Sequence, residues 1–194
     1  MAESYPWQSQ PSAKSGVVDE FSAFLHVKPG QAEKLREAAV AYANRPDRKT
    51  AVGPMLEEAE RVTGIHDFRI TLFDNDTRLL FATSFDTDWE PYVLDSIRLM
   101  KGISAWGQFL KYTVEAPDGV EVPGKISDTQ GLEFLNKHRI RAAAYDDTFK
   151  DMPIALKQKA TRVYNAFQKV LDNPEAAEAL KHPALKPLLD LASD

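Results

Sequence analysis

Residues 64–92, GIHDFRITLFDNDTRLLFATSFDTDWEPY, are the most clearly patterned stretch of the chain and decide its fold. Two apolar runs, at about 66–73 and 78–85, flank the polar segment Asp74–Thr77. Apolar runs of this length on either side of a short segment rich in Asp and Asn are typical of a β-hairpin. We therefore expect two antiparallel strands joined by a four-residue loop.

The loop determines which residues face one another across the hairpin. If Asp74–Thr77 is the loop, Phe73 lies opposite Arg78 and the other pairs follow by counting back. One face then collects the pairs His66/Phe85, Phe68/Thr83, Ile70/Phe81 and Leu72/Leu79, and the other collects Asp67/Ser84, Arg69/Ala82, Thr71/Leu80 and Phe73/Arg78. A shift of one residue would bury Arg69 and Arg78, which is costly. The first, apolar face is therefore expected to lie under helices, and the second to be open.

Other patterned segments lie on both sides of the hairpin. Residues 17–27 alternate between apolar and polar, as in a half-buried strand, and Lys28-Pro29-Gly30 ends it. The remaining predicted elements are helices at about 31–44, 51–62, from 88 onward, 103–112, 128–138 and 154–172, a strand at 139–147, and short helices from 174 and at 182–191.

The order of these elements contains β-α-β-β-α-β, the ferredoxin-like split motif. We predict an α+β fold, with a ferredoxin-like antiparallel sheet, an insert at 101–138 and extra C-terminal helices. This domain would cover residues 17–147, between a flexible N-terminal arm (1–16) and a C-terminal helical extension (148–194). Helices cover only one face of such a sheet. The other face needs a second copy, the C-terminal helices or a ligand.

Composition excludes several classes of function. The 194 residues carry a formal net charge of −5 and no long basic stripe, which argues against nucleic acid as a partner. The absence of cysteine excludes disulfides, thiolate ligands and cysteine nucleophiles. No apolar stretch approaches the roughly 20 residues of a membrane span, and the first residues lack the pattern of a signal peptide. We expect a cytoplasmic protein with no membrane and no nucleic-acid partner.

The candidate ligand-binding residues lie on the open face. Arg69 and Thr71 share this face with His26 of the first strand, and Tyr145 joins them if its side chain points the same way. Around an apolar floor, such residues suit a small anionic or carbonyl-bearing ligand. The alternative is that Arg69 and His26 pair across a dimer interface. His66 falls on the helix-facing side, either as a hydrogen-bonded boundary residue or as a ligand.

The familiar catalytic and binding motifs are absent. The four histidines are widely spaced, so a dedicated zinc site is not expected. There is no GxGxxG, GxxxxGK[ST] or GxSxG sequence. His138 follows a predicted helix, where it would complement the helix dipole.

Three stretches resemble the dimeric α+β barrel superfamily: HVKPGQAEKLREAA (26–39), GIHDFRITLFD (64–74) and RLLFATSFDTDWEPYVLD (78–95). That superfamily includes antibiotic-biosynthesis-type monooxygenases, chlorite-dismutase-like proteins and dye-decolourising peroxidases. Its members pack the open faces of two ferredoxin-like units together and hold a ligand or haem in the barrel or between sheet and helices. The resemblance implies a homodimer, and it makes haem a candidate cofactor with His66 as its candidate ligand. The insert and the helical C-terminus depart from the compact monooxygenases.

Two classes of function therefore stay open. The first is a small-molecule-binding oxidoreductase-like protein, haem-associated or of the cofactor-free monooxygenase type, that uses the open sheet face as a pocket. The second is a non-catalytic dimerising or scaffold module whose sheet face is fully packed. The sequence names neither a substrate nor catalytic residues.

Overall fold

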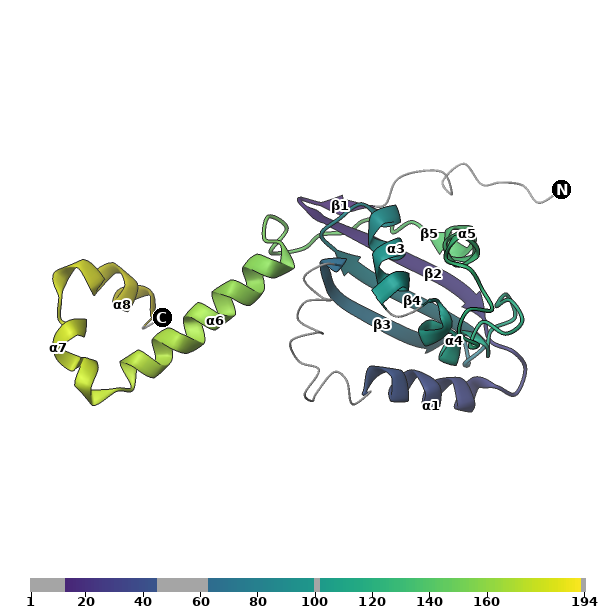
Figure 1. The fold of residues 1–194 in the computed structure, drawn as a ribbon, viewed down its shortest axis with the longest axis horizontal. Coiled ribbons are helices and arrows are strands. Elements are labelled where there is room, and N and C mark those ends of the chain that lie inside the picture. The colour runs from purple at the N-terminus through teal and green to yellow at the C-terminus, as the bar shows by residue number, and fades with distance from the viewer. Residues whose placement is uncertain (1–12, 45–62, 100–101, 193–194) are drawn as a thin grey trace. The chain divides into compact units, whose positions relative to one another are not determined.

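The computed structural model describes residues 13–44, 63–99 and 102–192, which form an α+β protein (Figure 1). The chain divides into two units, residues 1–154 and 155–194. The expected helix at 51–62 and most of the expected N-terminal arm lie outside the described residues.

The first unit contains a five-stranded antiparallel sheet in the order β1-β2-β4-β3, with β5 also paired to β2. The strands are β1 (Lys14–Ser15), β2 (Val18–His26), β3 (Ile65–Phe73), β4 (Arg78–Phe85) and β5 (Arg139–Ile140). β1 and β5 both lie along the edge of β2 that faces away from β4. The described strands form an open sheet and do not close into a barrel.

The predicted hairpin register is confirmed for seven of its eight pairs, from Asp67/Ser84 to Phe73/Arg78. The predicted pair His66/Phe85 is wrong, because a β-bulge at His66 places Ile65 opposite Phe85. A bulge adds one residue to one strand and shifts every later pair by one position. Ile65 therefore takes the core-facing place that the alternation assigns to His66.

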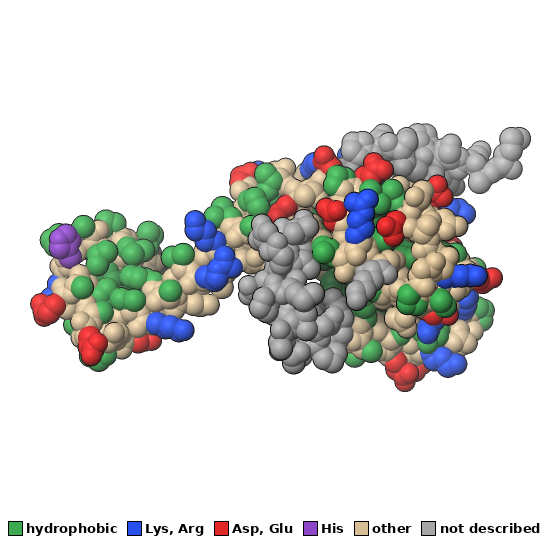
Figure 2. All heavy atoms as spheres, viewed as in Figure 1, with side chains coloured by type: hydrophobic (Ala, Val, Ile, Leu, Met, Phe, Trp, Pro, Cys, Tyr) green, Lys and Arg blue, Asp and Glu red, His purple; other side chains and the backbone are tan. Residues whose placement is uncertain are grey.

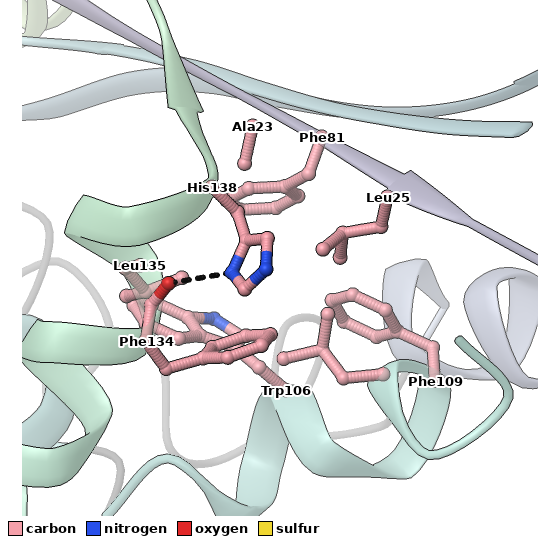
Figure 3. A pocket seen from close by; sticks show the side chains of 9 residues that line it. Ala23, Leu25, Phe81, Trp106, Phe109, Phe134, Leu135 and His138 are labelled. Atoms are coloured by element: carbon pink, nitrogen blue, oxygen red, sulfur yellow. Dashed lines mark hydrogen bonds between the residues drawn. The ribbon is translucent and has the colours of Figure 1, made fainter. Parts of the chain in front are cut away.

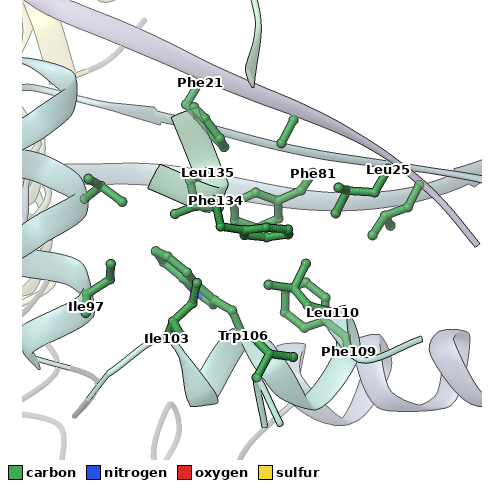
Figure 4. Close-up of a cluster of buried hydrophobic side chains, with 14 of the residues drawn as sticks. Phe21, Leu25, Phe81, Ile97, Ile103, Trp106, Phe109, Leu110, Phe134 and Leu135 are labelled. Carbon is green, nitrogen blue, oxygen red and sulfur yellow. The ribbon is translucent and has the colours of Figure 1, made fainter. Parts of the chain in front are cut away.

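Four helices of the first unit pack on one face of the sheet and share one core with it (Figure 4). They are α1 (Ala32–Ala43), α3 (Trp89–Leu99), α4 (Ser104–Leu110) and α5 (Asp128–His138). Two stacked aromatic pairs join β2 and β4 to α3. The ring centroids of Phe21 and Trp89, and those of Phe85 and Tyr92, are each 3.9 Å apart. The apolar face of the hairpin is therefore the covered face, as predicted.

Gly107 marks the closest approach between α4 and the loop that precedes α5. A Cβ atom at this position would lie 2.2 Å from the backbone carbonyl oxygen of Val120, well inside contact distance. A glycine in a helix interior normally weakens the helix. Here the missing side chain allows two pieces of backbone to pack against each other.

The predicted strand at 139–147 is wrong beyond β5. The backbone of the following segment finds partners outside a regular ladder: the Ala142 N–H donates to Glu20 Oε1 (3.1 Å), and the Val17 N–H donates to the Lys150 carbonyl (2.8 Å). These bonds satisfy backbone groups that a strand would otherwise pair. The segment is thereby held against the end of the sheet without extending it.

The second unit is helical, and none of its described residues is buried. It consists mainly of α6 (Ile154–Leu171), which begins at the border between the units, followed by α7 (Ala177–Leu180) and α8 (Lys186–Ala192). The predicted helix at 154–172 is confirmed.

Candidate functional site

The sheet face opposite the helices carries a partly exposed aromatic patch, which we define as Phe24, Phe73, Arg78 and Leu80. The rings of Phe24 and Phe73 meet edge to face, with centroids 5.6 Å apart. The guanidinium carbon of Arg78 lies 5.4 Å from the centroid of Phe24. Leu80 pairs with Phe24 in the neighbouring strand. Phe73 remains 37% exposed, so this face carries apolar surface in contact with solvent.

His26 lies at the end of β2 and is held by Glu115. Its Nδ1 is 2.5 Å from Glu115 Oε1, and its backbone N–H donates to Oε2 at 2.9 Å. Burial acts to raise the pKa of Glu115, but the hydrogen bonds from His26 outweigh burial and lower that pKa. The His26 side chain is 56% exposed, so the pair lies at the surface.

Arg69 lies farther along the same face, with Asp67 as its ionic neighbour at 4.0 Å. Arg69 is opposite Ala82, which pairs with Ser22, four positions before His26 on β2. Four residues of a strand span about 13 Å. Thr71 lies between these two levels. The structure therefore places His26, Arg69 and Thr71 on one face, as predicted, without gathering His26 and Arg69 into one pocket.

His66 lies in a group of carboxylates at the other end of the sheet, and only 7% of its side chain is exposed. Its Nε2 is 2.5 Å from Asp86 Oδ1, and its Nδ1 is 3.7 Å from Asp147 Oδ2. Asp86 Oδ2 also accepts the backbone N–H of Ile154 at 2.7 Å. Both ring nitrogens face carboxylates, so neither is offered to an iron atom. His66 is a hydrogen-bonded boundary residue, and this geometry does not fit a haem ligand.

Tyr145 lies close to the carboxylates of Asp147 and Asp67. Burial, aided by the charges of Asp147 and Asp67, raises the pKa of Tyr145. Ser84 donates to Asp67 Oδ2 at 3.0 Å, and Asp67 is the ionic neighbour of Arg69. The structure therefore shows two polar groups, one of His66, Asp86 and Asp147 and the other of Ser84, Asp67 and Arg69. Tyr145 lies near an aspartate of each group.

An inner cavity lies between the sheet and helices α4 and α5 (Figure 3). Its lining is apolar except for one histidine, and consists of Ala23, Leu25, Phe81, Trp106, Phe109, Leu110, Phe134, Leu135 and His138. The cavity leaves about 10 Å³ for the centre of a water-sized molecule, which is roughly room for one water. A haem does not fit in this space.

Sequence reasoning assigned His138 only to the helix dipole and missed its place in the cavity wall. Its Nδ1 lies 2.8 Å from the Phe134 carbonyl oxygen. Because a carbonyl only accepts, Nδ1 is the donor. Figure 3 shows the other ring nitrogen on the side away from this bond, among the lining side chains. The signal in the sequence was the spacing, since Phe134, Leu135 and His138 lie on one side of a helix.

Within the described part of the chain, no group of three or more His, Asp or Glu side chains is placed to bind a metal ion. None of the described helices is both long enough and apolar enough to cross a membrane. Neither a family model, nor a curated protein, nor a solved structure gives a match to this chain. The resemblance to dimeric α+β barrels therefore stays a prediction.

Proposed function

We propose that the protein is a self-associating α+β module, in which the open sheet face of one copy packs on the same face of a second copy. The observation that carries this proposal is the aromatic patch: helices cover one face of the sheet, while Phe24, Phe73 and Leu80 stand on the other. Burying apolar surface stabilises by about 25 cal/mol per Å². The strand order β5-β2-β4-β3, with helices on one face, supports a ferredoxin-like unit of the kind that dimerises in this way.

The charges on this face suit a second copy of the same chain. Arg69 and Asp67 lie side by side, and Arg78 lies 3.0 Å from Asp74. Contacts across a two-fold axis are reciprocal: where one residue of the first copy meets a second residue of the other copy, the same pair also meets with the two copies exchanged. Neighbouring charges of opposite sign allow an arginine of one copy to meet an aspartate of the other.

The geometry favours a non-catalytic module over an oxidoreductase. Glu115 holds His26, carboxylates face both nitrogens of His66, and the inner cavity has room for about one water. A general acid or base must reach its substrate within hydrogen-bond distance. In the described residues, these histidines are directed to partners within the protein.

Light scattering on a size-exclusion column tests the proposal. We expect the mass of two 21.7-kDa chains for the wild type and of one chain for Phe73→Glu, because the substitution buries an unpaired charge in the interface. The control is Val122→Glu, which adds the same charge to an exposed residue outside the patch and should remain a dimer. A monomeric wild type, or equal dissociation of both variants, would contradict the proposal. Circular dichroism of both variants checks folding.

The position of Arg69 favours a second candidate, the small-molecule-binding oxidoreductase-like protein. Arg69 lies on the open face with Thr71, and a dimer would enclose this arginine on the shared face, where a guanidinium suits a carboxylate ligand. Haem titration tests the haem-associated form of this candidate. The occupied nitrogens of His66 and the small cavity predict no Soret shift. A Soret shift that His66→Ala or His138→Ala abolishes would favour the second candidate.

A further inference from the structure

A second surface that no described residue covers lies on α6. Apolar residues line one face of this helix, and we call them the α6 stripe: Leu156, Ala160, Val163, Phe167 and Val170. No residue of α6 is buried, and Val163, in the middle of the stripe, is 59% exposed. Figure 2 shows hydrophobic side chains gathered on the surface of this unit. The short helices α7 and α8 therefore leave the stripe in contact with solvent.

The spacing of the stripe indicates the shape of its partner. Its residues are separated by four, three, four and three positions, which is the seam along which one helix packs against another. Tyr164 and Leu171 lie next to this seam and widen it on one side, as in a helix that packs within a bundle. The stripe is therefore matched to another helix.

The charge of α6 indicates the chemistry of that partner. The helix carries Lys157, Lys159, Arg162 and Lys169 and no Asp or Glu. Lys157 and Lys159 fall on the two sides of the stripe, the positions that select a partner in helix pairs. A second α6 would bring equally basic flanks, whereas acidic flanks would be attracted. The charge therefore argues against pairing of α6 with itself.

We propose that the α6 stripe binds an amphipathic helix of another protein that carries acidic residues beside its apolar seam. The apolar seam of that helix covers the stripe, and its carboxylates lie near the lysines of α6. This inference does not depend on dimerisation through the sheet, because it concerns a different unit and a different surface.

A pair of designed peptides tests the inference on the full chain. Both have three heptads with leucine at the seam positions; one carries Glu and the other Lys at the flanking positions. Fluorescence anisotropy of the labelled peptides measures binding. We expect the Glu peptide to bind at least about tenfold more tightly than the Lys peptide, and added salt to weaken it.

Two matched variants locate the binding surface. Val163→Glu places a carboxylate in the stripe, and Asn165→Glu places the same charge about 200° around the helix. We expect Val163→Glu to weaken binding of the Glu peptide by about tenfold or more, and Asn165→Glu by about threefold or less. Circular dichroism checks that both variants keep their helix content.

Several results would overturn the inference. They are no binding of the Glu peptide, equal binding of both peptides, and equal loss in the two variants. A wild-type dimer that Val163→Glu alone dissociates would assign the stripe to a second copy instead. Binding to vesicles of anionic lipid without peptide binding would assign it to a membrane surface.

Discussion

Tyr92 makes the stability of the fold sensitive to alkaline pH. Its ring stacks on Phe85, and its hydroxyl lies 3.2 Å from Thr83 Oγ1 inside the core. Burial raises the pKa of Tyr92 to about 12, because a phenolate in the core would lose its hydration. In the unfolded chain the same group ionises near its ordinary value of 10.0.

The sign and size of the effect follow from this difference. Below about pH 10 both states hold the proton, so the free energy of unfolding does not change with pH through this group. Between about pH 10 and 12 the unfolded chain ionises first, and the folded state loses stability. One pKa unit corresponds to about 1.4 kcal/mol, so the loss through Tyr92 is about 1.4 kcal/mol at pH 11 and approaches about 2.7 kcal/mol above pH 12.

Urea unfolding followed by circular dichroism, at about pH 8 and about pH 11, measures this loss. Tyr92→Phe should cost about 1 kcal/mol at the lower pH through its lost hydrogen bond. Raising the pH from about 8 to about 11 should then lower the free energy of unfolding of Tyr92→Phe by about 1.4 kcal/mol less than that of the wild type. Tyr164→Phe is the matched control, since that tyrosine is 61% exposed, and its pH dependence should equal that of the wild type. An equal alkaline loss in Tyr92→Phe and the wild type would refute the reasoning.

Two further substitutions test the packing of the first unit. Gly107→Ala should destabilise by about 1–3 kcal/mol in thermal or urea unfolding, although alanine is the better helix former, because its Cβ meets the backbone of the facing loop. In Gly131→Ala the new Cβ meets only side-chain atoms, at 3.3 Å or more, so this variant should lose less stability than Gly107→Ala. A larger loss in Gly131→Ala would contradict the close approach at Gly107. Asp86→Ala should cost about 2–3 kcal/mol by leaving His66 without its nearest carboxylate. Asp95, whose side chain is 42% exposed, provides the control: Asp95→Ala should lower the free energy of unfolding by less than about 0.5 kcal/mol. Equal losses in Asp86→Ala and Asp95→Ala would show that the pair with His66 contributes little.

The hairpin was predictable because two independent constraints agreed. The polar segment Asp74–Thr77 placed the turn, and the cost of burying Arg69 and Arg78 excluded the shifted register. The alternation of apolar and polar residues in 66–73 and 78–85 then predicted the remaining pairs along both strands. It failed only at His66, because a bulge leaves no mark in the alternation of polar and apolar residues. The strand predicted after Ile140 failed for a related reason: side chains such as Glu20 satisfy its backbone, and their carboxylates come from distant sequence.

The candidate site was less predictable than the fold. Which polar groups come into contact depends on how the irregular segments run, and the sequence pattern does not show this. The Glu115 side chain reaches His26 across 89 positions, and the backbone N–H of Asp147 donates to Ser15 Oγ across 132. Periodicity predicts neither of these two contacts, because it only assigns a residue to one face of its own strand or helix. Periodicity therefore placed His26 and Arg69 correctly on one face, yet left their distance along it open.

The described residues leave two apolar surfaces in contact with solvent, the aromatic patch on the sheet and the α6 stripe. A catalytic site needs polar groups that converge on a space for the substrate, whereas in the described residues the carboxylates of Asp86 and Asp147 converge on His66. Apolar residues that face solvent have no such internal explanation. The aromatic patch around Phe24 and the stripe around Val163 each keep a regular spacing that the covered core does not require. Contiguous exposed apolar surface often marks an interaction site, which is why both of our proposals concern what the protein binds.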